Sequence, residues 1–122
     1  MIKLSPSVLA ADPMHLGRDA RMACEAGCDE LHFDVMDGHF VPNLTFGPMM
    51  CAAVRPLTHL PLDVHLMIDR PVRYVDQFCD AGADIVTCHV EADSQENILA
   101  AVDKIHVKGK KAGVVVLSLI HI

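Results

Sequence analysis

The sequence predicts an α/β protein in which a parallel β-sheet is covered by helices. Short segments that are apolar almost throughout alternate with longer segments whose apolar residues recur at helical spacing. Strands that are apolar on both faces are typical of parallel sheets, because helices bury both faces of such a sheet. A short internal repeat supports this reading, since Ala-Gly-Cys-Asp at 26–29 and Ala-Gly-Ala-Asp at 81–84 each precede a strand-like segment.

Five strands and four helices are expected to alternate along the chain. The strands are expected at residues 2–9, 29–35, 61–68, 84–90 and 113–117. The first helix should begin after Asp12-Pro13, where an N-cap precedes proline at the first helical position, and should end at Gly27. The other three helices are expected to begin at Gly47-Pro48, Arg70-Pro71 and Ser94.

The internal repeat also predicts where a functional site would lie. Counted from the aspartate of each repeat, Asp34 and His89 fall at the same offset, near the ends of their strands. In a (β/α)₈ barrel this carboxyl end of the strands carries the active site. Such barrels usually need about 250 residues, whereas this sequence has 122. The pattern alone is therefore compatible with two folds: an open, doubly wound sheet, or the first half of a barrel.

Composition favours a cytoplasmic enzyme over other classes of protein. Hydrophobic residues make up 52% of the chain and the net charge is −6. Basic residues are scattered apart from Lys108, Lys110 and Lys111, and no apolar run reaches the ~18 residues of a membrane span. The five cysteines include no Cys-x-x-Cys pair and indicate reduced thiols. We expect neither nucleic acid nor membrane as a partner.

The segment at 31–43 carries the strongest chemical signal. It places His32, Asp34 and Met36 at alternate positions of an apolar run, so that a β-strand would present all three on one face. A second run, at residues 63–67, does the same with Asp63, His65 and Met67. Two strands that each present a histidine and an acid predict a metal site or an acid/base site. Either histidine taken singly would be interpreted as a core residue. Because both alternate along a strand in the same way as Asp34, a metal site or an acid/base site is the favoured interpretation.

The chain resembles the ribulose-phosphate 3-epimerase family in three motifs. These are Pro-Ser-Val-Leu-Ala-Ala-Asp at 6–12, the run at 32–43, and Asp-Val-His-Leu-Met at 63–67. The resemblance covers about residues 1–115 and implies a (β/α)₈ TIM barrel truncated to its first four βα units plus strand five. Residues 116–122 form an apolar tail that departs from the family pattern. We expect that tail not to be native to the family.

The resemblance implies a metal-dependent epimerase of the pentose phosphate pathway. Members interconvert D-ribulose 5-phosphate and D-xylulose 5-phosphate at C3 through an enediolate, and we expect the full-length parent to be a homo-oligomer. Two alternatives stay open: an allulose-6-phosphate 3-epimerase, or a catalytically inactive half-barrel fragment. The family's second catalytic aspartate, fourth metal ligand and phosphate-binding loops belong to later strands.

The resemblance also implies roles for individual residues. His32, Asp34 and His65 match three metal ligands, and Asp34 doubles as one of two acid/base carboxylates. The residues matched to substrate contact are Ser7, Met36, His65 and Met67. Imidazole and carboxylate ligands suit one divalent ion, and the sequence does not choose among Zn²⁺, Fe²⁺, Mn²⁺ and Co²⁺.

Overall fold

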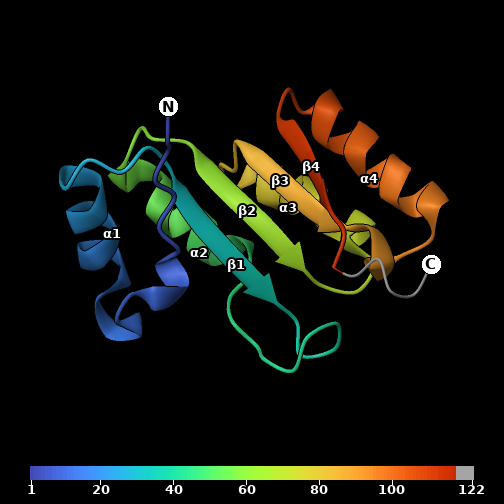
Figure 1. Cartoon of the computed structure of the whole chain (residues 1–122), viewed down its shortest axis with the longest axis horizontal. Coiled ribbons are helices and arrows are strands. Elements are labelled where there is room, and N and C mark those ends of the chain that lie inside the picture. The colour runs from blue at the N-terminus through green and yellow to red at the C-terminus, as the bar shows by residue number, and fades with distance from the viewer. Residues whose placement is uncertain (118–122) are drawn as a thin grey trace.

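A computed structural model describes residues 1–117 and shows a parallel sheet with its helices on one side (Figure 1). The strands are β1 (Leu31–Met36), β2 (Leu62–Met67), β3 (Ile85–His89) and β4 (Lys111–Val115). The α-helices are α1 (Leu16–Glu25), α2 (Pro48–Val54), α3 (Val75–Asp80) and α4 (Gln95–Val107). Short 3₁₀ turns lie at Val8–Ala10, Pro13–His15, Arg55–Leu57, Pro71–Arg73 and Val90–Ala92.

The strands pair in chain order, β1-β2-β3-β4, and every pairing is parallel. Each strand is joined to the next through a helix, which is the βα repeat that the apolar pattern predicts. The carboxyl ends of the strands therefore lie along the same edge of the sheet. In the register of β1 and β2, Asp34 is paired with His65 and Met36 with Met67.

The core lies between the sheet and the helices. On β1 and β2, alternate residues are buried against the helices, and these are Leu31, Phe33, Val35, Leu62, Val64 and Leu66. Each such side chain contributes about 1.5–3 kcal/mol to the free energy of folding when it is fully removed from water. The intervening residues are half-buried on the opposite face of the sheet, which we call the open face. This alternation places the predicted site residues outside the core.

The strand expected at residues 2–9 does not form. The segment lies beside β1 with a single parallel bridge, between Ser7 and His32, and the carbonyls of Leu4 and Pro6 accept from the backbone N–H groups of Asp29 and His32 at 2.9 Å. Pro6 has no N–H to continue the ladder. Ser7 then accepts from the N–H of Leu9 and caps a 3₁₀ turn, which ends the extended stretch.

Two further boundaries differ from expectation. The helix expected from Arg70-Pro71 is a 3₁₀ turn at Pro71–Arg73 followed by α3, which begins at Val75, because the backbone of Tyr74 between them, with φ of −124°, departs from helical values. The last strand, expected at 113–117, is β4 at Lys111–Val115. The expected tail, 116–122, lies largely outside the described residues, since the structure describes only its first two residues. The division at residue 115 stays a prediction.

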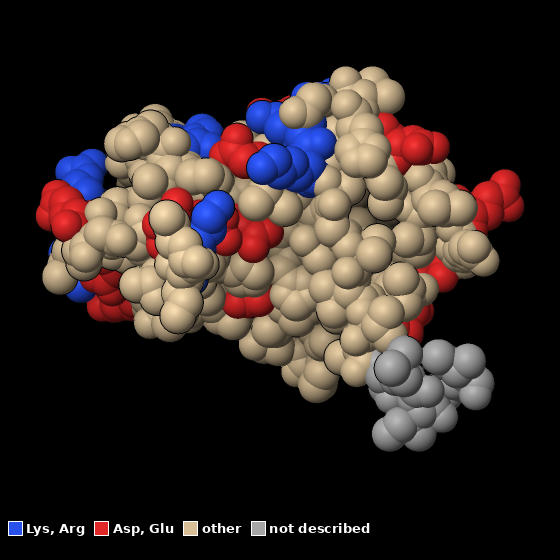
Figure 2. Space-filling view, turned by 45° about the horizontal axis from the view of Figure 1, so that its top comes forward, with Lys and Arg blue, Asp and Glu red and all other residues tan. Residues whose placement is uncertain are grey.

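The surface mixes the two signs of charge. On the face drawn in Figure 2, basic and acidic side chains lie close to one another rather than in separate fields. Surface ion pairs include Lys108 with Asp80, at 2.8 Å, and Lys104 with Asp76, at 3.5 Å. Within residues 1–117, α4 is the longest helix, with 13 residues, and no helix could cross a membrane.

Candidate metal centre on the open face of the sheet

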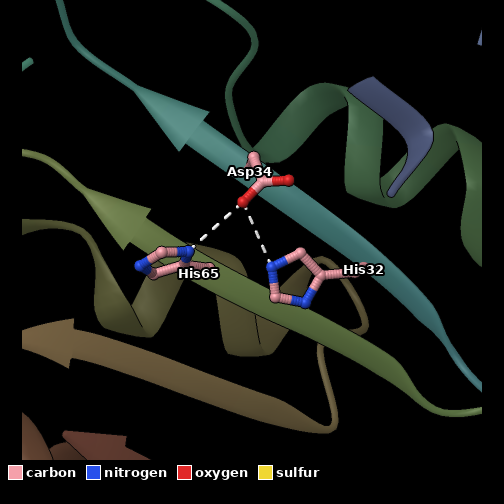
Figure 3. Close-up of side chains that lie close together, drawn as sticks. All are labelled: His32, Asp34 and His65. Atoms are coloured by element: carbon pink, nitrogen blue, oxygen red, sulfur yellow. Dashed lines mark hydrogen bonds and ion pairs between the residues drawn. The ribbon is translucent and has the colours of Figure 1, made fainter. Parts of the chain in front are cut away.

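Three side chains from β1 and β2 converge on the open face. His32 and Asp34 are two residues apart on β1, and His65 lies opposite Asp34 on β2. The Asp34 Oδ1 atom is 3.2 Å from His32 Nε2 and 3.2 Å from His65 Nδ1. Figure 3 shows both imidazoles turned toward this carboxylate. One ligand atom from each residue lies within 4.8 Å of the others, which is close enough for a shared cation.

The surroundings of Asp34 keep its carboxylate charged. Burial raises the pKa of Asp34, but the hydroxyl of Ser7 and the imidazoles of His32 and His65 outweigh it and lower that pKa below its ordinary value. The Ser7 hydroxyl donates to Asp34 Oδ2 at 2.5 Å. The two carboxylate oxygens thus have separate partners, because Oδ1 faces the histidines and Oδ2 faces Ser7.

His32 is held between two carboxylates. Its Nδ1 atom lies 3.0 Å from Asp63 Oδ2, and Asp63 is its neighbour in the strand register. The pKa of His32 is raised, chiefly by its hydrogen bond to Asp63 and in spite of burial, with Asp34 adding to the effect. The sequence placed Asp63 on this face by strand parity but did not identify its partner.

His89 is buried next to His65. Its side chain is only 3% exposed, and the Nε2 atoms of His65 and His89 are 2.7 Å apart. The Nδ1 atom of His89 points toward the Glu91 carboxylate, 4.0 Å away. Burial, and then His65, hold the pKa of His89 below its usual value. The internal repeat placed His89 at the same offset as Asp34, and the structure shows that His89 contacts a site residue.

The remaining predicted residues lie on the same face. Ser7 contacts Asp34, while Met36 and Met67 are paired in the register at the carboxyl ends of β1 and β2, where both are half-buried. The structure therefore places all the residues that the sequence analysis selected on one side of the sheet, with Ser7, His32, Asp34 and His65 in contact and the two methionines further along the strands. Their roles as ligands and substrate contacts stay predictions.

Thr45 supports the site and was not identified from the sequence. Its hydroxyl donates to the carbonyl of Asp34 at 2.8 Å and accepts from the N–H of Met36 at 2.9 Å. It therefore pins the loop after β1 to the backbone that carries the site. No periodic signal marks Thr45, because it lies in a loop, where no helix or strand period relates a residue's position to the direction of its side chain.

The donor set fits a divalent cation. Two imidazole nitrogens and one carboxylate oxygen are ligands that Zn²⁺, Fe²⁺, Mn²⁺ and Co²⁺ accept. The carboxylate is held ionised, and each histidine has a second contact on its far ring nitrogen, as ligating histidines commonly do. His32, Asp34 and His65 could therefore hold one ion.

The fold and the site together define a βα-repeat protein of the barrel class with a candidate metal centre. A solved type I 3-dehydroquinate dehydratase from Clostridium difficile superimposes with a TM-score of 0.69 and 16% identity, over 92% of this chain and 49% of that one. At that identity the likeness shows the fold alone. It agrees with a TIM barrel of which this chain spans about half.

The chain belongs to the ribulose-phosphate 3-epimerase family, whose model matches residues 3–122. It is 51% identical to the ribulose-phosphate 3-epimerase of Bacillus subtilis, over 94% of this chain and 52% of the relative. The enzyme of the same name from Synechocystis is 49% identical, over 93% and 50%. The chloroplastic ribulose-5-phosphate-3-epimerase of Arabidopsis thaliana is 51% identical, over 93% and 41%. The chain spans about half the length of these curated relatives.

Proposed function

We propose that this chain forms the first half of the active site of a metal-dependent ribulose-phosphate 3-epimerase. The substrate is a ketose phosphate, and the reaction interconverts D-ribulose 5-phosphate and D-xylulose 5-phosphate. The observation that carries the proposal is the ionised Asp34 carboxylate, which two imidazoles flank on the open face of the sheet. The names of the relatives support the five-carbon substrate over allulose 6-phosphate.

Asp34 is the group that we propose takes the proton from C3. A general base must be charged at the working pH and must lie within hydrogen-bond reach of the proton that it removes. The contacts that lower the pKa of Asp34 supply the first requirement. Loss of the C3 proton next to the C2 ketone gives an enediolate, and a cation held by His32, Asp34 and His65 would stabilise the negative charge on its oxygens.

The remaining residues of the open face orient the base and exclude water. Ser7 donates to the Asp34 oxygen that faces away from the histidines, which fixes the carboxylate plane. Met36 and Met67 would line the reacting carbons with apolar, polarizable side chains that disfavour water. Inversion also needs a proton donor on the other face of the sugar. We propose that this donor comes from the half of the family fold that the matched relatives have beyond this segment.

The experiment that tests this proposal joins residues 1–115 to the second half of the Bacillus subtilis relative. The chimera should epimerise ribulose 5-phosphate once it is loaded with a divalent ion, whereas the 122-residue chain should show no appreciable turnover. Asp34→Asn should abolish both turnover and the exchange of the C3 hydrogen with deuterated solvent. Asp103→Asn, an exposed change on α4 with the same loss of charge, is the matched control.

Two outcomes would contradict the proposal. A folded, metal-loaded chimera without activity would show that these residues do not complete an epimerase site. Retained C3 exchange in the Asp34→Asn chimera would show that Asp34 is not the base. The cellular location in the cytoplasm and the homo-oligomeric state of the full-length parent remain predictions, and gel filtration of the active chimera tests the second.

A further inference from the structure

The loop that follows β1 projects beyond the carboxyl end of that strand (Figure 1), and a single carboxylate braces it. Asp37 Oδ1 accepts from the N–H groups of His39 and Phe40, at 2.9 and 2.8 Å. Asp37 Oδ2 accepts from the N–H of Asp69, which follows β2, at 2.8 Å. The carboxylate therefore joins the loop after β1 to the segment after β2 and fixes the backbone of Phe40.

The side chain of Phe40 reaches the third strand of the sheet. Its ring centroid lies 5.2 Å from that of His89, at the carboxyl end of β3, and the two ring planes are inclined by 47°. Aromatic rings at such a separation attract one another. The His89 side chain is only 3% exposed. A residue of the loop after β1 thus packs against a buried imidazole two strands away.

His89 in turn contacts His65 of the candidate metal centre. The two imidazole rings are stacked, with centroids 4.9 Å apart and planes inclined by 28°, and their Nε2 atoms are 2.7 Å apart. A hydrogen bond between two imidazoles needs one N–H and one lone pair, and either ring can supply the N–H. The contact therefore fixes where the His65 ring lies without depending on which ring carries the proton.

We propose that Phe40 is a positioning residue that acts through His89 to hold the imidazole of His65 toward Asp34. His65 Nδ1 lies 3.2 Å from Asp34 Oδ1, so a rotation of the ring would carry this nitrogen away from the carboxylate. Groups behind a ligating histidine commonly set the orientation of its ring. The inference deepens the function proposed above and rests on it for the metal readout, while the placement of the His65 ring can be measured without metal.

A role in core packing alone would place Phe40 against other apolar side chains. Phe46, in the same connection between β1 and α2, is of that kind, because its ring meets the Phe33 ring edge-on, with centroids 5.9 Å apart, and packs against the core. Within residues 1–117, the ring that the structure pairs with Phe40 is that of His89. Both phenylalanines are half-buried. Phe46→Leu is therefore the matched control for Phe40→Leu.

The first test measures the placement of the His65 ring in the metal-free 122-residue chain, at about pH 8, where an imidazole is largely neutral. Carbon-bound protons next to the two Nε2 atoms should give nuclear Overhauser effects between His65 and His89. The Phe40 ring protons should give them with His89, and the signals are assigned by their loss in His65→Gln and His89→Gln. Phe40→Leu should weaken the effects between the two histidines and shift the His65 ring signals. Phe40→Tyr and Phe46→Leu should preserve both.

The second test measures Co²⁺ binding by the same proteins. Phe40→Leu should weaken the affinity by about 3- to 10-fold, which corresponds to the loss of one aromatic pair, and should change the visible Co²⁺ spectrum. Phe40→Tyr keeps an aromatic ring and should bind as the wild type does. Phe46→Leu should lower the melting temperature at least as much as Phe40→Leu but leave the Co²⁺ affinity unchanged. A loss of affinity that merely followed stability would appear in both leucine variants.

Each outcome decides a separate claim. Wild-type spectra without effects that link Phe40 to His89 and His89 to His65 would overturn the proposal without any variant, even if Phe40→Leu failed to fold. Wild-type His65 signals and Co²⁺ affinity in Phe40→Leu would also overturn it, as would equal losses of affinity in Phe40→Leu and Phe46→Leu. If the ring contacts are present and are lost in Phe40→Leu, but the wild-type chain does not bind Co²⁺, the metal centre of the proposed function is contradicted and the positioning of His65 by Phe40 is supported.

Discussion

Removal of the Arg55 guanidinium should destabilise the fold at the end of the sheet opposite the candidate site. Nη1 donates to the carbonyl of Gly82 at 3.0 Å and to Asp84 Oδ2 at 2.8 Å. Nη2 donates to the carbonyls of Thr58 and Leu60 at 2.8 and 2.7 Å. One side chain thus ties together the segments that lead into β2 and β3.

The cost of Arg55→Met follows from these four hydrogen bonds. Methionine keeps an unbranched apolar stem, while three carbonyls and one carboxylate each lose one hydrogen-bond donor. Hydrogen bonds to charged groups contribute about 1.5–3 kcal/mol each when buried. The Arg55 side chain is 27% exposed, so water can replace part of what is lost, and Asp84 keeps the N–H of Leu62 at 2.9 Å. We expect a loss of about 2–4 kcal/mol in the free energy of unfolding.

Urea denaturation followed by circular dichroism would measure this loss. Arg21→Met, a change of the same type at an exposed position of α1, should alter the free energy of unfolding by less than about 0.5 kcal/mol. If Arg55→Met cost less than about 1 kcal/mol relative to this control, the guanidinium would be a weak surface group. The assignment of Arg55 as the clamp between the two strand entries would then be wrong.

Two further perturbations test the loops above the site. Thr45→Val leaves the N–H of Met36 without its acceptor, so unfolding by urea should show a loss of about 1–3 kcal/mol, and an unchanged midpoint would contradict the bridge. Burial raises the pKa of Asp37, but three backbone N–H donors outweigh it and lower that pKa below 3.8. The carboxylate therefore stabilises the fold above about pH 3.8, and this contribution is lost as the pH falls. Asp37→Asn should flatten the fall in melting temperature between about pH 6 and about pH 3, and an equally steep fall would refute this role.

Strand parity could be predicted from the sequence because the geometry of an extended chain fixes it. Alternation placed His32 and Asp34 on one face, and the structure has them there. Parity does not fix the register between strands, and a shift of two residues would pair His32 with His65 while keeping every side chain on its face. The observed pairing of Asp34 with His65 therefore needed the fold.

Features that hydrophobic periodicity does not describe escaped the sequence analysis. The apolar run at 2–9 predicted a strand, but hydrophobicity does not register the missing donor of Pro6 or the cap formed by Ser7. The bridge made by Thr45 depends on the path of a loop. The ring nitrogen that each histidine presents depends on the neighbouring strand, which sequence periodicity does not describe.

The alternation along β1 means that six consecutive residues meet two separate requirements, one for packing of the core and one for the proposed site. Leu31, Phe33 and Val35 face the helices and are part of the core, while His32 and Asp34 lie on the open face, where the proposed chemistry would take place. Substitutions of the outward residues can change ligand preference without opening a cavity in the core. A new activity can therefore evolve on this strand while the packing beneath it stays constant.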